Sequence, residues 1–128
     1  EWFNDQAISK EVYTLFEKHG VSNIVVDTAG RRDLLHMRLT TPKVFVRYVG
    51  ANNPQSDRKR LDDWANRLKI WVDQGIRDIY FFVHQNIEVE SPFLSAYFIQ
   101  KLNRQFGTNL QIPKLITSKE DTSPTLGF

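Results

Sequence analysis

Two kinds of hydrophobic pattern divide this chain into short segments. In three of them apolar residues recur three and four positions apart, which is the spacing of one face of an α-helix. These segments predict helices over residues 5–19, 57–74 and 91–106. In three others the apolar residues are consecutive, as in strands of a parallel sheet that are covered on both faces. They predict strands over residues 21–26, 44–49 and 78–83.

The residues between these segments are typical of turns and helix ends. Gly20 can end the first helix, because glycine adopts the left-handed conformation without strain. Residues 28–43 predict a long loop with room for only a short helical piece, and residues 51–56 predict a turn. Ser91 followed by Pro92 predicts a helix start, with the serine as cap and the proline at the first helical position.

The two later helices have distinct apolar and polar faces. The face of the helix over 57–74 that we expect to be buried comprises Leu61, Trp64, Ala65, Leu68, Trp71 and Val72. Its charged residues, which include Asp57 and Arg60, predict a solvated, charge-balanced surface. The expected buried side of the last helix comprises Phe93, Ala96, Tyr97, Leu102 and Phe106.

The order of these elements indicates the fold class. Helix, strand, loop, strand, helix, strand, helix is the order of parallel α/β structure, and right-handed crossovers place the three strands side by side. Three such strands make a poor free-standing sheet, because two of them are edges that expose backbone groups and apolar side chains. The pattern therefore predicts further flanking strands, supplied by another part of a longer chain or by a partner copy.

Composition narrows the class of protein. The 128 residues are 41% hydrophobic and 25% charged, which is typical of a folded soluble domain. The absence of cysteine excludes thiol chemistry and disulfides within these residues and is compatible with a cytoplasmic location. A net charge of +2 argues against a nucleic-acid-binding surface. No apolar run reaches the roughly 20 residues of a membrane span, so no membrane partner is expected.

Polar residues occur where parallel α/β folds bind ligands, at the carboxyl ends of the strands. Asp27, Arg47 and His84 fall at or near those ends and are the candidate catalytic residues. Because a charge within an apolar strand needs a partner, we expect Arg47 to pair with Asp27. That pair would be a structural ion pair or would position the arginine for a substrate. His84 is either a general base, since imidazole titrates near neutral pH, or a hydrogen-bonded structural group.

The loops after the second and third strands each precede a helix, so their N–H groups can bind an anion such as a phosphate or a carboxylate. The candidate ligand-binding residues there are Gly50, Asn52, Gln85 and Asn86. The alternative is that these are ordinary turn-forming residues. The three histidines are scattered and form no metal-binding spacing, so we expect no metal site and no cofactor.

Several strings of residues, in the right order, resemble the YecE-like family, catalogued as domain of unknown function 72. They are FVRYVG at 45–50, LDDWA at 61–65, the strand over 79–85 with its polar end, the last helix with Ala96, and Glu1-Trp2-Phe3. The resemblance covers about residues 1–115 and leaves 116–128 as an expected flexible tail. It implies the C-terminal part of a (β/α)8 TIM barrel, with the sixth, seventh and eighth strands. The chain departs from the family at Val49, where histidine is common, and at His84-Gln85, where an asparagine pair is common.

Two functional hypotheses remain at this point. In the first, the chain is part of a barrel enzyme acting on a small anionic or sugar-like metabolite, with Arg47 orienting the anionic group and Asp27 or His84 moving a proton. In the second, it is a non-catalytic α/β interaction module whose polar residues hold the strand ends together. Alone, these residues are expected to be inactive and to self-associate through exposed strand edges.

Overall fold

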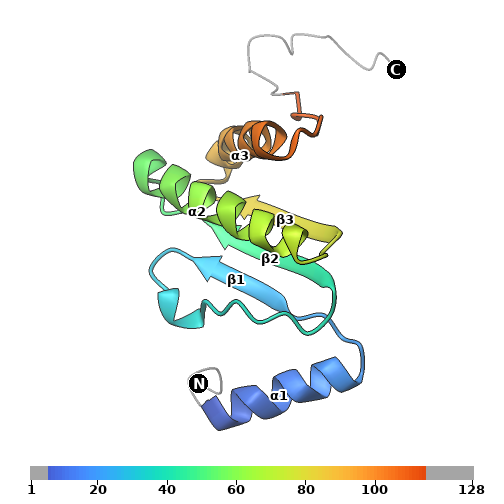
Figure 1. The fold of residues 1–128 in the computed structure, drawn as a ribbon. Coiled ribbons are helices and arrows are strands. Elements are labelled where there is room, and N and C mark those ends of the chain that lie inside the picture. The colour runs from blue at the N-terminus through green and yellow to red at the C-terminus, as the bar shows by residue number, and fades with distance from the viewer. Residues whose placement is uncertain (1–5, 115–128) are drawn as a thin grey trace, which may run out of the picture.

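The computed structural model describes residues 6–114 (Figure 1). Its elements, in chain order, are α1 (Gln6–Lys18), β1 (Ile24–Thr28), the 3-10 helix η2 (Arg32–Leu34), β2 (Lys43–Val49), α2 (Pro54–Asp73), β3 (Asp78–His84), the 3-10 helix η3 (Glu88–Glu90) and α3 (Ser91–Phe106). The predicted tail over 116–128 and the Glu1-Trp2-Phe3 stretch lie outside the described residues.

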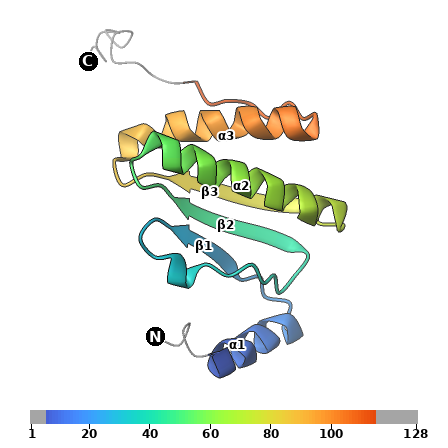
Figure 2. The same cartoon turned by 60° about the vertical axis from the view of Figure 1, so that its left-hand side comes forward.

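The three strands form one parallel sheet in the order β1-β2-β3, which confirms the predicted parallel α/β fold. α2 and α3 cover the same face of this sheet, whereas α1 lies beyond the β1 side (Figures 1 and 2). Within residues 6–114, β1 and β3 are the edge strands. Three parallel strands with helices of this kind are consistent with part of an α/β barrel.

β2 shows how the sheet divides into two faces. Its Val44, Val46 and Tyr48 are fully buried in a cluster with α2 and α3, while Arg47 between them is exposed. On α2 the predicted apolar face is buried in the same cluster, with Leu61, Trp64, Ala65, Leu68 and Trp71. Each fully buried valine or leucine of this cluster stabilises the fold by about 1.5–3 kcal/mol. The hydrophobic core therefore lies between the sheet and these two helices.

α2 begins earlier than the sequence pattern predicts. Its first residue is Pro54, and the side chain of Asn53 caps it by accepting a hydrogen bond from the N–H of Ser56 at 3.1 Å. The predicted turn over 51–56 is therefore wrong in its second half. An asparagine followed by a proline is typical of a turn and also of a helix cap followed by its first residue, and here the second alternative holds.

The buried side of α3 matches the predicted one only in part, since Tyr97, Leu102 and Phe106 do pack against the core. Leu94 and Phe98 are its buried residues, whereas Phe93, expected in the core, is 53% exposed. Both sets have helical spacing, so the side that faces β3 depends on how the helix docks. Ser91 differs as well, because its hydroxyl accepts from the N–H of Gln85 at 2.9 Å instead of capping α3.

The two phenylalanines of α3 give a direct test of this docking. Phe98 is 2% exposed and packs on Phe81 with ring centroids 4.5 Å apart. We expect Phe98→Ala to lower the free energy of unfolding by about 3–5 kcal/mol, measured by urea denaturation. Phe93→Ala is the matched control and should change it by less than about 1 kcal/mol. Equal losses would contradict the docking of α3.

Candidate functional site

The carboxyl ends of the three parallel strands meet at one edge of the sheet, where the register shows which side chains share a row. On the face opposite α2 and α3, here called the open face, the last row is Thr28, Val49 and His84. Alternation along each strand places two more rows on this face: Val26, Arg47 and Phe82, followed by Ile24, Phe45 and Tyr80. Among these, Arg47 carries a permanent charge.

Arg47 lies exposed among apolar neighbours on the open face. Its register partners are Val26 and Phe82, and its side chain makes no hydrogen bond or ion pair with the described residues. The predicted pairing of Arg47 with Asp27 is wrong. Asp27 is one residue further along β1, in register with Tyr48, so alternation turns its carboxylate to the helix-covered face.

Asp27 is 1% exposed and is the centre of a buried polar network. One carboxylate oxygen accepts hydrogen bonds from the guanidinium groups of Arg32 and Arg60, each at 2.7 Å. The other accepts from the indole N–H of Trp64, also at 2.7 Å. Both oxygens of the Asp27 carboxylate thus accept hydrogen bonds, and none of the donors lies on the open face.

Arg60 joins the ends of two strands to α2. It donates to the main-chain oxygens of Asp27 and Val49, each at 3.1 Å, and its guanidinium carbon lies 4.4 Å from the ring centroid of Tyr48. Its side chain is only 16% exposed, so the predicted solvated position for this arginine is wrong. Its burial could have been predicted from its position four residues before the buried Trp64, since residues four apart share a helix face.

Asp57 is the second charged residue of α2, after Arg60, that the sequence pattern wrongly placed in solvent. It is fully buried, and it accepts from the N–H groups of Ala51 at 2.8 Å and Asn53 at 3.1 Å. The Tyr48 hydroxyl donates to its main-chain oxygen at 3.1 Å, and burial raises the pKa of Tyr48, which keeps that hydroxyl protonated. The spacing of Asp57 from Leu61 already places it on the buried stripe of α2.

The amides expected to cradle an anion already have acceptors in this structure. The N–H of Gly50 donates to the main-chain oxygen of His84 at 2.8 Å, and that of Asn52 to Oε1 of Gln85 at 3.1 Å. The amides of Ala51 and Asn53 donate to Asp57. The loop after β2 therefore surrounds the carboxylate of Asp57, and a ligand would have to displace it.

The candidate residues after β3 differ in how they are used. Gln85 is 4% exposed, and its Nε2 donates to Asp57 at 2.9 Å while its Oε1 accepts from Asn52. Both ends of its amide are thus bound within the protein. Asn86 is exposed beside it, and His84 is half-buried on the open face.

Comparison with known proteins identifies the family. The family model described as protein of unknown function DUF72 matches residues 1–117. The chain belongs to this family. No curated protein and no solved structure matches the chain. Membership in DUF72 agrees with the resemblance found in the sequence and carries no established activity.

Two kinds of feature are absent from the described part of this DUF72 chain. None of its helices is long and apolar enough to cross a membrane. Over residues 6–114, no three histidine, cysteine, aspartate or glutamate side chains gather where they could hold a metal ion.

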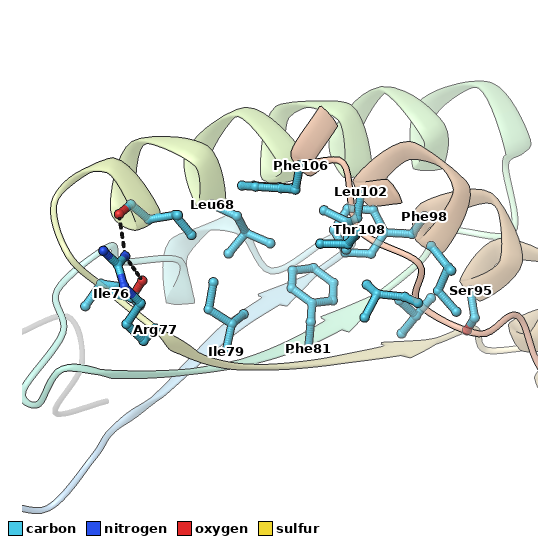
Figure 3. Close-up of a pocket in the computed structure, with 14 residues that line it drawn as sticks. Leu68, Ile76, Arg77, Ile79, Phe81, Ser95, Phe98, Leu102, Phe106 and Thr108 are labelled. Carbon is cyan, nitrogen blue, oxygen red and sulfur yellow. Dashed lines mark hydrogen bonds between the residues drawn. The ribbon is translucent and has the colours of Figure 1, made fainter. Parts of the chain in front are cut away.

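An apolar groove of about 610 Å³ lies between α2, α3 and the helix-facing side of β3 (Figure 3). Its walls include Leu68 from α2, Phe81 from β3, and Phe98 and Leu102 from α3. At one end Arg77 donates to main-chain oxygens of Val72 and Ile76, so its guanidinium is partly occupied. The groove offers hydrophobic surface and few reactive groups.

The different placements of two arginines can be tested by removing their charges in this DUF72 chain. Arg60→Met leaves the buried carboxylates of Asp27 and Asp57 without their shared cation. We expect it to lower the free energy of unfolding by about 3–5 kcal/mol. Arg47→Met removes an exposed charge and should change it by less than about 1 kcal/mol. Denaturant titrations of both variants measure these free energies of unfolding. A larger loss of stability for Arg47→Met than for Arg60→Met would refute the placement of the two arginines.

Proposed function

We propose that this chain forms part of a binding or catalytic site for a small anionic or sugar-like metabolite on the open face, at the carboxyl ends of the strands. The observation that carries this proposal is Arg47, an exposed arginine among apolar side chains with no ionic partner in residues 6–114. Parallel α/β folds bind their ligands at this end of the sheet.

An anion is the ligand that suits Arg47 best. A guanidinium presents a planar set of N–H donors that bind carboxylate or phosphate oxygens in pairs. Its apolar neighbours Val26 and Phe82 lower the local polarity, which strengthens a charged hydrogen bond made there. A ligand with one anionic group and a less polar body fits this surface.

His84 supplies a group able to move a proton. It lies on β3, adjacent to β2, and two residues beyond the row of Arg47. Strand spacing and rise give about 8 Å between their Cα atoms, so one small ligand reaches both side chains. Imidazole titrates near neutral pH and can act as general base or acid. Thr28 adds a hydroxyl in the row of His84, on β1.

Asp27 has a different role in this proposal from the one expected at first. Its carboxylate faces α2 and is held by three side chains, so it supports the strand ends without touching the ligand. Gly50, Asn52 and Gln85 likewise shape the rim, because their polar groups face one another.

A phosphate titration followed by NMR tests the proposal. We expect inorganic phosphate to shift the side-chain signals of Arg47 and His84 saturably, and to leave the amides of residues 50–53 nearly unchanged. Arg47→Met should abolish the shifts. Arg58→Met, which removes an exposed arginine stacked on Tyr97, is the matched control and should retain them. Shifts that survive Arg47→Met, or that are confined to the loop amides, would contradict the proposal.

A second candidate function is assembly through the sheet edges. The helix-facing residues of β3, Ile79, Phe81 and Val83, remain half-buried beside the apolar groove, whereas those of β2 are fully buried. The outer edge of β3 is unpaired within the described chain, and unpaired edges favour association. Two copies related by a twofold axis would pair their β3 strands antiparallel and bring their grooves together.

Self-association is tested by light scattering of the chain over a range of concentrations. We expect a dimer at high concentration that Ile99→Lys weakens, because this residue lines the groove and a charge there would be buried in the assembly. Phe93→Lys places the same charge on an exposed part of α3 outside the groove and should leave the dimer intact. A wild-type chain that stays monomeric at high concentration rules this candidate out.

A further inference from the structure

Two buried polar side chains join the loops that follow β2 and β3. Asp57 is in the first turn of α2, and Gln85 follows β3 directly. The Gln85 amide donates to the Asp57 carboxylate at 2.9 Å. Between them these side chains accept the N–H groups of three consecutive residues, Ala51, Asn52 and Asn53. Residues 51–53 of the loop after β2 are thus held by one carboxylate and one amide.

Further hydrogen bonds join the same two loops through their main chains. The N–H of Gly50 donates to the oxygen of His84 at 2.8 Å, and the N–H of Ile87 donates to the Asn52 side chain at 3.1 Å. Asn52 adopts a left-handed backbone conformation with φ of 56°, which asparagine tolerates better than most residues. On both sides of Gln85, therefore, the chain after β3 is attached to the loop after β2.

The close approach of Gln85 explains the glycine at position 50. A Cβ there would overlap the Gln85 side chain, lying 2.6 Å from its Nε2. The glycine thus leaves room for the Gln85 side chain, and the backbone of Gly50 does not have a positive φ. The side chain of Gln85 and the backbone of Gly50 form one fitted contact next to His84.

Both Asp57 and Gln85 use their polar atoms within the protein, so neither contacts a ligand in this arrangement. We infer that they are positioning residues that hold the two loops as one unit and so fix His84 relative to Arg47. This inference rests on the function proposed above for Arg47 and His84. It assigns the loops a supporting role. It also predicts that a substitution of Gln85 changes the position of His84, which lies on the opposite face of the strand end.

The test replaces Gln85 by methionine in the full chain, because methionine fills a similar volume without donor or acceptor. We expect Gln85→Met to shift the NMR signals of the His84 imidazole and to weaken inorganic phosphate binding by at least tenfold. The matched control is Gln105→Met. Gln105 also bridges two elements, donating to the main-chain oxygen of Ala65 at 3.1 Å, but it lies far along α3 from the loops. It should leave the His84 signals and the phosphate affinity unchanged.

Unchanged His84 signals and phosphate affinity in folded Gln85→Met would overturn the inference, because a purely structural role lowers stability without moving either. If wild type binds no phosphate, the proposed function fails, and a shifted His84 imidazole in Gln85→Met still supports the positioning role. If Gln85→Met does not fold, Asn52→Gly decides. It keeps the left-handed backbone, removes only the acceptor for the Ile87 N–H, and should shift the same His84 signals.

Discussion

A carboxylate buried under a helix must be matched by donors, and that of Asp27 is matched by Arg32, Arg60 and Trp64. Removing a charge from water costs several kcal/mol unless it is paired and hydrogen-bonded. The pairing therefore determines how β1, β2 and α2 come together. Arg60 extends the network to the main-chain oxygens at the ends of both strands. The carboxyl edge of the sheet therefore depends on the pairing of Asp27 with Arg60.

The charged residues of the two sheet faces differ in whether they have partners within the protein. On the helix-covered face the buried carboxylates of Asp27 and Asp57 pair with Arg60, and the amides of residues 51–53 donate to Asp57 and Gln85. Arg47 stands on the other face with apolar neighbours and no such partner in residues 6–114. Among the side chains in the rows of the open face, Arg47 is thus the charged group that the proposed ligand would bind.

The sheet of this DUF72 chain also leaves apolar side chains partly exposed on β3. β2 is buried on its helix side, whereas β3 is only half-buried next to a groove of about 610 Å³. The aromatic residues Tyr80 and Phe82 stack on Phe45 on the open face, with ring centroids 6.0 and 4.7 Å, respectively, from that of Phe45. Apolar surface of this kind favours a further protein segment or a copy of the chain.

Local pattern alone determined the order of the elements, the parallel sheet, and the apolar stripe of α2, because helical and strand periods depend on residues a few positions apart. The same pattern predicted that Asp27, Arg47 and His84 lie at or near the carboxyl ends of the strands. Only the tertiary structure decided that Asp27 pairs with Arg60, 33 residues away, and that Gln85 meets Asp57. A shift of one residue along a strand reverses the face of a side chain, and docking of a helix selects which polar group is buried. Such pairings depend on the placement of whole elements, which no local period encodes.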